Sequence, residues 1–127
     1  MNIRKNSMFR NIYEADCFED EFRQMTKERL ALTPPFPRYQ KWLIRSLTIL
    51  EELQKDALKL AGFEQLTNVN PVLYSIRYPH SPLNPRVLYA YIDGNNIILL
   101  AAFKEKNKND YARNIKTALN RLKLICN

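Results

Sequence analysis

The chain has 127 residues, the length of a single domain with one hydrophobic core. Hydrophobic residues make up 46% of it and charged residues 26%, a composition that excludes an intrinsically disordered protein. Twenty Lys and Arg side chains oppose thirteen Asp and Glu side chains, so the formal net charge is +7. This charge favours a polyanion as partner over a cation or an acidic protein.

Several classes of protein are excluded by residues that are rare. Two glycines and one histidine exclude a Gly-rich phosphate-binding loop and most His-rich metal sites, so we expect no metal and no cofactor. Cys17 and Cys126 lack the spacing of a zinc site and the density of a disulfide scaffold, and we interpret both as reduced thiols. No apolar segment follows the basic N-terminus, and the longest apolar run, residues 97–103, is too short to span a bilayer. We therefore expect a cytoplasmic protein with no membrane association.

The first predicted element is an amphipathic helix. Asp16 and Glu19 have the spacing of a capping box, which marks a helix start. Phe18, Phe22 and Met25 then recur at intervals of four and three residues, which places them on one helix face. The pattern around residues 9–13 also permits a short strand before this helix.

A second, longer helix follows a proline-rich connector at residues 34–37, because proline suits only the first turn of a helix. Gly62 is a plausible end for this helix. The two helices together predict an αα-hairpin over about residues 14–62. The apolar positions that keep the helical period in the second helix are Tyr39, Leu43, Leu47, Leu50, Leu53, Ala57 and Leu60.

The period changes from 3.6 to 2 after Gly62. Alternation over residues 72–78 predicts a half-exposed strand, and a loop with three prolines separates it from a second strand over residues 86–92. Asp93-Gly94-Asn95 predicts a tight hairpin turn, and the nearly continuous apolar run to Phe103 predicts a central strand. A final helix is predicted from the apolar face formed by Ile115, Ala118, Leu119, Leu122 and Ile125.

These elements predict an α+β fold with a single domain over residues 1–127. The N-terminal αα-hairpin is expected to pack on a twisted, mainly antiparallel sheet of three or four strands. The sheet and the final helix occupy about residues 63–125.

The charge is concentrated in the predicted sheet and final helix. Residues 1–33 carry six basic and six acidic side chains, and residues 34–70 carry five and four. Residues 71–127 carry nine basic and three acidic side chains, a net charge of +6. This asymmetry is typical of a one-sided face that binds a polyanion, although a solvated charged helix produces part of it.

Several segments follow one another in a characteristic order over about residues 63–123. They are Tyr74-Ser75-Ile76-Arg77, Arg86-Val87-Leu88-Tyr89, the strand after Asp93-Gly94, Phe103-Lys104-Glu105-Lys106, Asp110-Tyr111, and Ala118 with Arg121. The ordered set is more specific than any one segment, and it resembles the RelE/HigB superfamily of bacterial toxins, including its phage-derived group. Ser75 stands where the strictest RelE-like members carry lysine, and Glu105 interrupts the basic run.

The resemblance implies the toxin of a toxin–antitoxin pair, which cleaves mRNA, often at the ribosome, and is neutralised by an antitoxin. Cleavage without a metal needs a base for the 2′-hydroxyl, cations for the phosphate and an acid for the 5′-oxygen. Two alternatives stay open. One is a noncatalytic, ParE-like inhibitor that binds a protein target, and the other is a basic, phage-derived protein that binds nucleic acid by charge alone.

Two arginines are candidate phosphate ligands. Arg86 is the first, because its guanidinium matches two phosphate oxygens; the alternative is a strand-end arginine paired with a carboxylate. Arg77 is the second, on the exposed face of its strand, unless it is merely solvated. Lys108 and Arg113 are expected to add ordinary attraction to the RNA backbone.

The other candidate catalytic residues follow the central strand or precede the second one. Lys104 and Lys106 lie two apart, so extended backbone would aim both to one side, where one holds phosphate and the other transfers a proton. Tyr111 is a candidate for stacking on an RNA base, and the alternative is an aromatic side chain that packs under the helix. His80 is a candidate acid or base, and the alternative is a histidine that is simply exposed in its loop. Glu105 could act as a base, or form local ion pairs with its neighbouring lysines.

Overall fold

The computed structural model describes residues 1–126 and contains three α-helices, one 3-10 helix and six strands. None of the described helices is long and apolar enough to cross a membrane. In chain order the elements are β1 (Ile3–Lys5), β2 (Ile12–Ala15), α1 (Phe18–Thr26), α2 (Arg38–Leu53), the 3-10 helix η1 (Gln54–Lys59), β3 (Phe63–Gln65), β4 (Tyr74–Arg77), β5 (Pro85–Asp93), β6 (Asn96–Lys104) and α3 (Lys108–Cys126).

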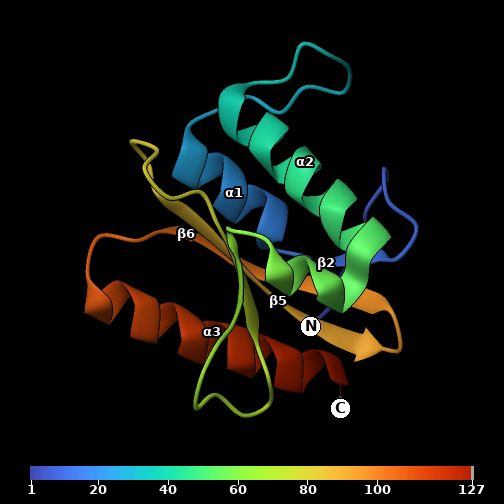
Figure 1. Ribbon diagram of the computed structural model, residues 1–127, viewed down its shortest axis with the longest axis vertical. Coiled ribbons are helices and arrows are strands. Elements are labelled where there is room, and N and C mark those ends of the chain that lie inside the picture. Colours follow the sequence, from blue (N-terminus) through green and yellow to red (C-terminus); the bar gives the residue numbers. More distant parts are fainter. Residues whose placement is uncertain (127) are drawn as a thin grey trace.

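All six strands form one mixed sheet in the order β1-β2-β6-β5-β4-β3. Only the β2–β6 pair is parallel, and the other four pairs are antiparallel. Helices α1 and α2 lie on one side of the sheet and α3 lies on the other (Figure 1). The molecule therefore has three layers, and the sheet is the middle one.

The two central strands are apolar on both faces because both faces are covered. Val87 and Tyr89 of β5 belong to the core beneath α1 and α2, whereas Leu88 and Ala90 belong to the core beneath α3. The predicted strands over residues 86–92 and 96–103 agree with β5 and β6. The strand predicted over residues 72–78 is confirmed as the shorter β4, but its predicted half-exposure is wrong, since Tyr74, Ser75 and Ile76 are all buried. The predicted hairpin turn is also confirmed, since Asp93 pairs with Asn96 and Gly94 has a φ of +56°.

The prediction of an N-terminal αα-hairpin on a three- or four-stranded sheet is wrong. Two strands precede α1, and the sheet has six strands, one pair of them parallel. Strand β1 is exposed throughout and shows no alternation, and β2 pairs with a strand 85 residues away, between Ile12 and Ile97. Such pairing leaves no local pattern in the sequence, which explains why these strands were not predicted as part of the sheet.

The second helix also ends earlier than predicted. α2 stops at Leu53, because Gln54 adopts a positive φ of +52°, and η1 continues the chain to Lys59. At the other end, Glu28 takes the place of a side-chain cap: its carboxylate accepts hydrogen bonds from the backbone N–H groups of Tyr39 and Gln40. The segment between α1 and α2 is thus fixed to α2 by polar contacts.

An ion pair completes the sheet where β2 ends. β2 pairs with β6 only along Ile97 to Leu99, so the next backbone groups of β6 have no neighbouring strand on that side. Arg121 of α3 donates to the carbonyl oxygen of Leu100 and forms a bidentate pair with Glu21 of α1, with donor–acceptor distances of 2.6 to 2.8 Å. The Glu21 carboxylate also accepts from the backbone N–H of Ala102 at 3.5 Å. Helices on opposite faces are thereby joined around the edge of β6.

Candidate functional site

A cluster of charged side chains lies on the α3 side of the sheet, where β3, β4, β5 and β6 meet the start of α3. Arg77 of β4 stands directly opposite Arg86 of β5 in the antiparallel register. Like charges in directly opposed positions destabilise a sheet unless other groups compensate them. Two carboxylates supply that compensation here.

Arg86 is the centre of the cluster and is buried, with 8% of its side chain exposed. Its Nε lies 2.6 Å from Oε2 of Glu105, and its Nη1 lies 2.9 Å from Oε1 of Glu64. Its guanidinium also lies over the ring of Tyr111, with 4.5 Å between the central carbon and the ring centroid. Arg86 is thus neutralised on two sides and covered on a third.

Glu64 connects the two arginines. Its second carboxylate oxygen, Oε2, lies 3.8 Å from Nη1 of Arg77, which completes a chain of alternating charge from Glu105 through Arg86 and Glu64 to Arg77. Glu64 and Arg77 are the accessible members, with 37% and 38% of their side chains exposed. A molecule that approaches from solvent therefore meets Glu64 and Arg77 before it meets Arg86.

Two polar atoms in this cluster are buried without a hydrogen-bond partner among residues 1–126. They are Oγ of Ser75, a residue with 0% exposure, and Nε of Arg77. Both residues belong to β4, which pairs with β3, and Ser75 stands directly opposite Glu64 in that pairing. A buried polar atom without a partner costs about 1 to 3 kcal/mol, so this part of the sheet is less stable than a fully paired one.

Tyr111 closes the cluster from the first turn of α3. Its ring packs edge-to-face on Phe103, with centroids 6.1 Å apart. Burial raises the pKa of its hydroxyl, while the charge of Arg86 opposes that rise. The phenol stays protonated at neutral pH and can donate a hydrogen bond. Asn107 fixes this turn, since its side chain accepts from the backbone N–H of Asp110 at 3.0 Å.

The structure brings together three of the predicted site residues, Arg77, Arg86 and Tyr111. It separates Lys104 from them. Phe103 belongs to the core under α3 and Ala102 to the core under α1 and α2, so the alternation of side chains along β6 directs Lys104 to the α1 and α2 face, away from the cluster. β6 ends at Lys104, so the predicted same-side arrangement with Lys106 has no strand to support it.

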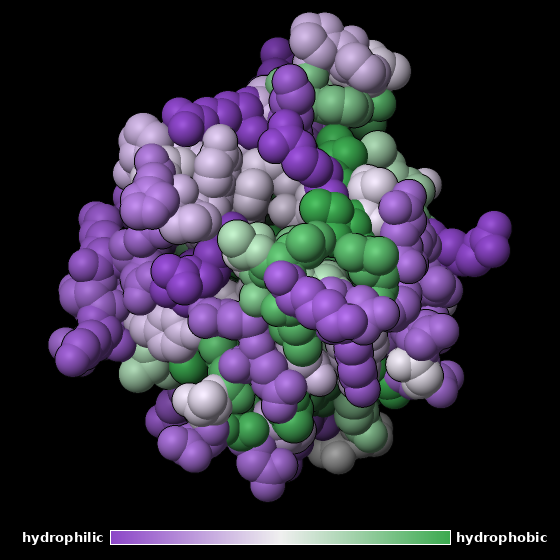
Figure 2. All heavy atoms as spheres, viewed as in Figure 1, coloured by the Kyte–Doolittle hydropathy of each residue, from purple (hydrophilic) through white to green (hydrophobic). Residues whose placement is uncertain are grey.

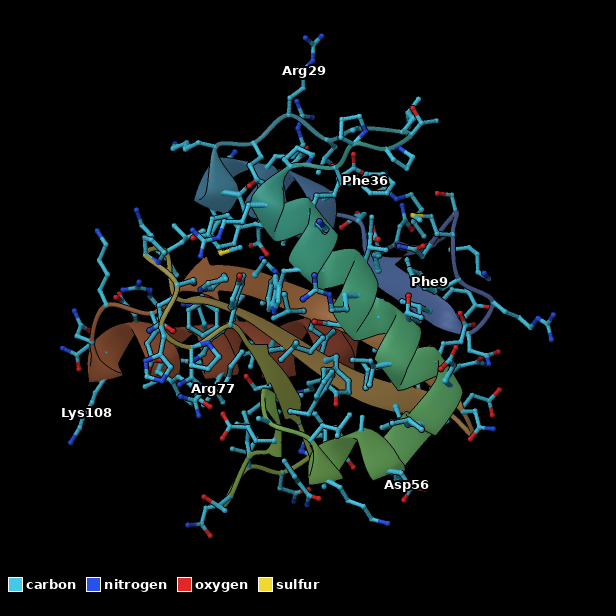
Figure 3. All side chains as sticks on the ribbon, turned by 45° about the horizontal axis from the view of Figure 1, so that its top comes forward. Phe9, Arg29, Phe36, Asp56, Arg77 and Lys108 are labelled. Carbon is cyan, nitrogen blue, oxygen red and sulfur yellow. The ribbon has the colours of Figure 1, made fainter. Side chains whose placement is uncertain are left out.

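The remaining predicted residues lie around the cluster or apart from it. Lys106, Lys108 and Arg113 are exposed near the start of α3, and Arg113 pairs with Asp110 at 2.7 Å. Figure 3 shows Arg77 near this end of α3 and Lys108 at its edge, pointing to solvent. His80 is exposed in the loop between β4 and β5, with a φ of +65°, and no hydrogen bond or ion pair within residues 1–126 joins it to the cluster.

Sequence reasoning missed Glu64. Its strand has three residues and no strict alternation, so no periodic signal marks it. A signal did exist in the charge pattern, because two opposed arginines need carboxylates. After Gly62 the chain contains only four acidic residues, of which Asp93 belongs to the hairpin turn and Asp110 to the start of α3.

The comparison with protein families gives one match. Residues 37–123, more than two thirds of the chain, match the model of the family described as Phage derived protein Gp49-like (DUF891). The matched region includes every residue of the cluster described above. Searches of curated proteins and of solved structures found no match. The resemblance to phage-derived proteins is therefore confirmed, while the narrower assignment to the RelE/HigB superfamily stays a prediction.

Proposed function

This chain belongs to the Gp49-like family of phage-derived proteins, which is associated with toxins of toxin–antitoxin systems, and we propose that it is such a toxin and cleaves mRNA. An antitoxin is the partner that this family suggests. The proposed substrate is mRNA, bound at the ribosome, and the proposed location is the cytoplasm. The observation that carries the proposal is the chain of charges from Glu105 to Arg77, half buried and half open to solvent.

The proposed reaction is attack of a 2′-hydroxyl on the adjacent phosphate. Glu64 takes the proton of the 2′-hydroxyl, because it is the more exposed of the two carboxylates that contact Arg86. The 2′-oxygen bonds to phosphorus as the bond to the 5′-oxygen breaks. Arg77 offers its guanidinium to the phosphate oxygens, and the neutral phenol of Tyr111 gives a proton to the leaving 5′-oxygen. The products are a 2′,3′-cyclic phosphate and a 5′-hydroxyl.

Arg86 has a different role in this proposal from the phosphate ligand expected of it. Both of its bonded nitrogens already hold carboxylates, so it positions Glu64 and Glu105 and supports the ring of Tyr111. The exposed cations Lys106, Lys108 and Arg113 attract the RNA backbone toward the cluster. Lys104 and His80 stay candidates from the sequence, and no contact of theirs supports a place in the reaction.

The experiment compares induced expression of the wild-type chain with expression of Glu64→Gln and Arg77→Met. Wild type should arrest growth and produce new 5′ ends in translated mRNA, mapped by primer extension. Both variants should lower the cleavage rate by about 10² to 10⁴, the range for loss of an acid–base or phosphate-stabilising group. Lys59→Ala is the matched control, since its side chain is 82% exposed and lies outside the cluster. Equal cleavage by Glu64→Gln, with expression matched, would contradict the assignment of the base.

A noncatalytic inhibitor is the second candidate function, and one observation favours it. The charges of Arg86 are compensated within the protein, as in a structural ion-pair network. In that case induction should stop growth while mRNA stays intact, and Glu64→Gln should not relieve toxicity. Induction of the DNA-damage response under these conditions would identify a ParE-like target.

A further inference from the structure

Arg38, at the start of α2, is held in place by two aromatic rings. Its guanidinium carbon lies 5.4 Å from the ring centroid of Tyr39 and 5.5 Å from that of Tyr78. These two rings pack edge-to-face, and Tyr78 also stacks on Trp42 with centroids 5.7 Å apart. The Tyr39 hydroxyl oxygen accepts a hydrogen bond from the backbone N–H of Leu83 at 3.1 Å. The surface beneath the guanidinium is therefore fixed.

Arg38 is exposed, and no carboxylate among the described residues forms an ion pair with it. Glu28 uses its two carboxylate oxygens for the backbone N–H groups of Tyr39 and Gln40. By contrast, five other arginines pair with carboxylates: Arg4, Arg77, Arg86, Arg113 and Arg121. A guanidinium that lies over aromatic faces keeps its N–H donors in its own plane, so Arg38 can present a fork of donors to an oxyanion.

The loop between β4 and β5 connects Arg38 with the Arg86 cluster. On one side of the loop, the backbone of Leu83 binds the tyrosine beneath Arg38. On the other side, the carbonyl oxygen of Asn84 accepts a hydrogen bond from the backbone N–H of Glu105 at 3.2 Å, and the Glu105 carboxylate binds Arg86. Arg38 and the cluster therefore lie on two sides of one loop.

Strand β4 gives a second connection between the two sites. Arg77 of the cluster and Tyr78 beneath Arg38 are consecutive residues. Arg77 reaches Glu64 on the α3 side, whereas Tyr78 packs on α2, so their side chains lie on opposite faces of the sheet. In Figure 1 the β4–β5 loop lies at the left, on the same side of the molecule as the connection from β6 to α3. Both sites thus lie at one end of the sheet.

The surface between the two arginines is basic. The loop, residues 78–84, contains no acidic residue and carries the exposed His80. Lys104 is exposed, stands opposite Pro85 where the loop ends, and forms no ion pair within residues 1–126. Figure 2 shows that mainly hydrophilic side chains, in purple and pale purple, cover this left side of the molecule. A polyanion that crosses the loop from Arg77 to Arg38 therefore meets Lys104 and no carboxylate of the loop.

We propose that Arg38 binds a second phosphate of the RNA strand whose scissile phosphate lies at Arg77. The strand then crosses the β4–β5 loop from the α3 side to the α2 side. This assignment rests on the proposed function, because the first phosphate is the one that the cluster is proposed to cut. The ligand is a polymer, since one phosphate group does not reach arginines on opposite faces of a sheet. An RNA strand is favoured over an acidic protein segment because it continues from the proposed cleavage site.

The test uses an RNA that cannot be cut, so that binding is measured independently of ribonuclease activity. The probe is a fluorescein-labelled, single-stranded 2′-O-methyl RNA of about 12 nucleotides, which lacks the attacking hydroxyl. Fluorescence anisotropy with the full chain measures its Kd over a series of salt concentrations.

Arg38→Met should raise the Kd about tenfold at low salt. It should also reduce the slope of log Kd against log salt by about 0.7, the value for one phosphate contact with a single strand. Arg38→Lys should keep the slope and still weaken binding, because an ammonium is a point charge without the fork of donors. Circular dichroism checks that both variants are folded.

Arg10→Met is the matched control, because Arg10 is exposed and forms no ion pair with any described residue. It belongs to the loop between β1 and β2, at the right of Figure 1, and its loss should leave the Kd and the slope nearly unchanged. Equal effects of Arg38→Met and Arg10→Met would overturn the proposal and leave the proposed reaction standing.

Two further outcomes separate this proposal from its alternatives. A polyglutamate peptide of the same length that binds more tightly than the RNA, and depends on Arg38, would overturn the assignment in favour of an acidic protein segment. A wild-type chain that binds the RNA through Arg38 but leaves translated mRNA intact would support Arg38 as an RNA ligand and contradict the reaction alone.

Discussion

Replacement of Arg86 by methionine tests whether the ion-pair cluster is part of the framework of the fold. Methionine keeps most of the volume of the side chain and removes its charge and its donors. It leaves Glu64 and Glu105 without the cation that lies 2.9 and 2.6 Å from their oxygens. It also removes the cation that lies over the ring of Tyr111.

The expected cost follows from these contacts. Two hydrogen bonds between charged groups are worth about 1.5 to 3 kcal/mol each, and removing one partner of a buried pair costs about 3 to 5 kcal/mol. The carboxylates of Glu64 and Glu105 remain 37% and 24% exposed, so water recovers part of that loss. We expect Arg86→Met to lower the free energy of unfolding by about 3 kcal/mol.

Urea unfolding followed by circular dichroism measures this difference. Arg77→Met is the internal comparison, because its ion pair is 3.8 Å long and 38% of its side chain is exposed; its cost should stay below about 1 kcal/mol. Adding Glu105→Gln to Arg86→Met should recover part of the loss, since it removes an uncompensated charge. The reasoning is refuted by equal costs for the two arginine variants, or by a cost below about 1 kcal/mol for Arg86→Met.

Three further outcomes are expected. Arg121→Ala should lower the free energy of unfolding by about 2 to 4 kcal/mol, because it leaves the buried Leu100 carbonyl oxygen and Glu21 without their shared donor; a cost below 1 kcal/mol in urea unfolding would contradict this account of the β6 edge. Gly62→Ala should cost more than Gly94→Ala in thermal unfolding, because its φ is +93° and a Cβ there would meet the Arg77 carbonyl oxygen at 3.1 Å, whereas Gly94 has open space. Burial raises the pKa of Tyr91 to about 12, so its contribution to stability is complete below pH 10 and is lost as the pH rises toward 12; Tyr91→Phe should move the midpoint of alkaline unfolding upward, and a downward shift would argue against it.

The local elements of the second half of the chain could be predicted because their signals are local. Strict alternation, a Gly94 turn and an apolar run between them identify β4, β5 and β6, and a helical period identifies α3. The two helices of the first half were also detected by their apolar spacing. The prediction was wrong about the strands that precede these helices. β1 is an exposed edge strand of three residues, and β2 belongs to the sheet only because it pairs with the distant β6.

The candidate site shows the same division. Arg77, Arg86 and Tyr111 stood out because their types and positions matched a basic site, and the fold brings them together. The ion pairs of these arginines depend on how the strands assemble into the sheet. The sequence therefore could not show that Arg86 is buried and Arg77 is exposed. Likewise, the charge count placed the basic excess in residues 71–127, and only the fold shows that Glu64 and Glu105 neutralise Arg86 within it.

The most direct test of the proposed activity is the chemistry of the RNA ends that the purified chain produces. The protein is incubated with ribosomes that carry a defined mRNA, and the cleaved fragments are analysed by mass spectrometry. Attack by the 2′-hydroxyl predicts an upstream fragment that ends in a 2′,3′-cyclic phosphate and a downstream fragment that begins with a 5′-hydroxyl, in yields that fall at least a hundredfold with Glu64→Gln and not with Lys59→Ala. Fragments with a 3′-hydroxyl and a 5′-phosphate, or intact mRNA at protein concentrations equal to those that arrest growth, would contradict the account.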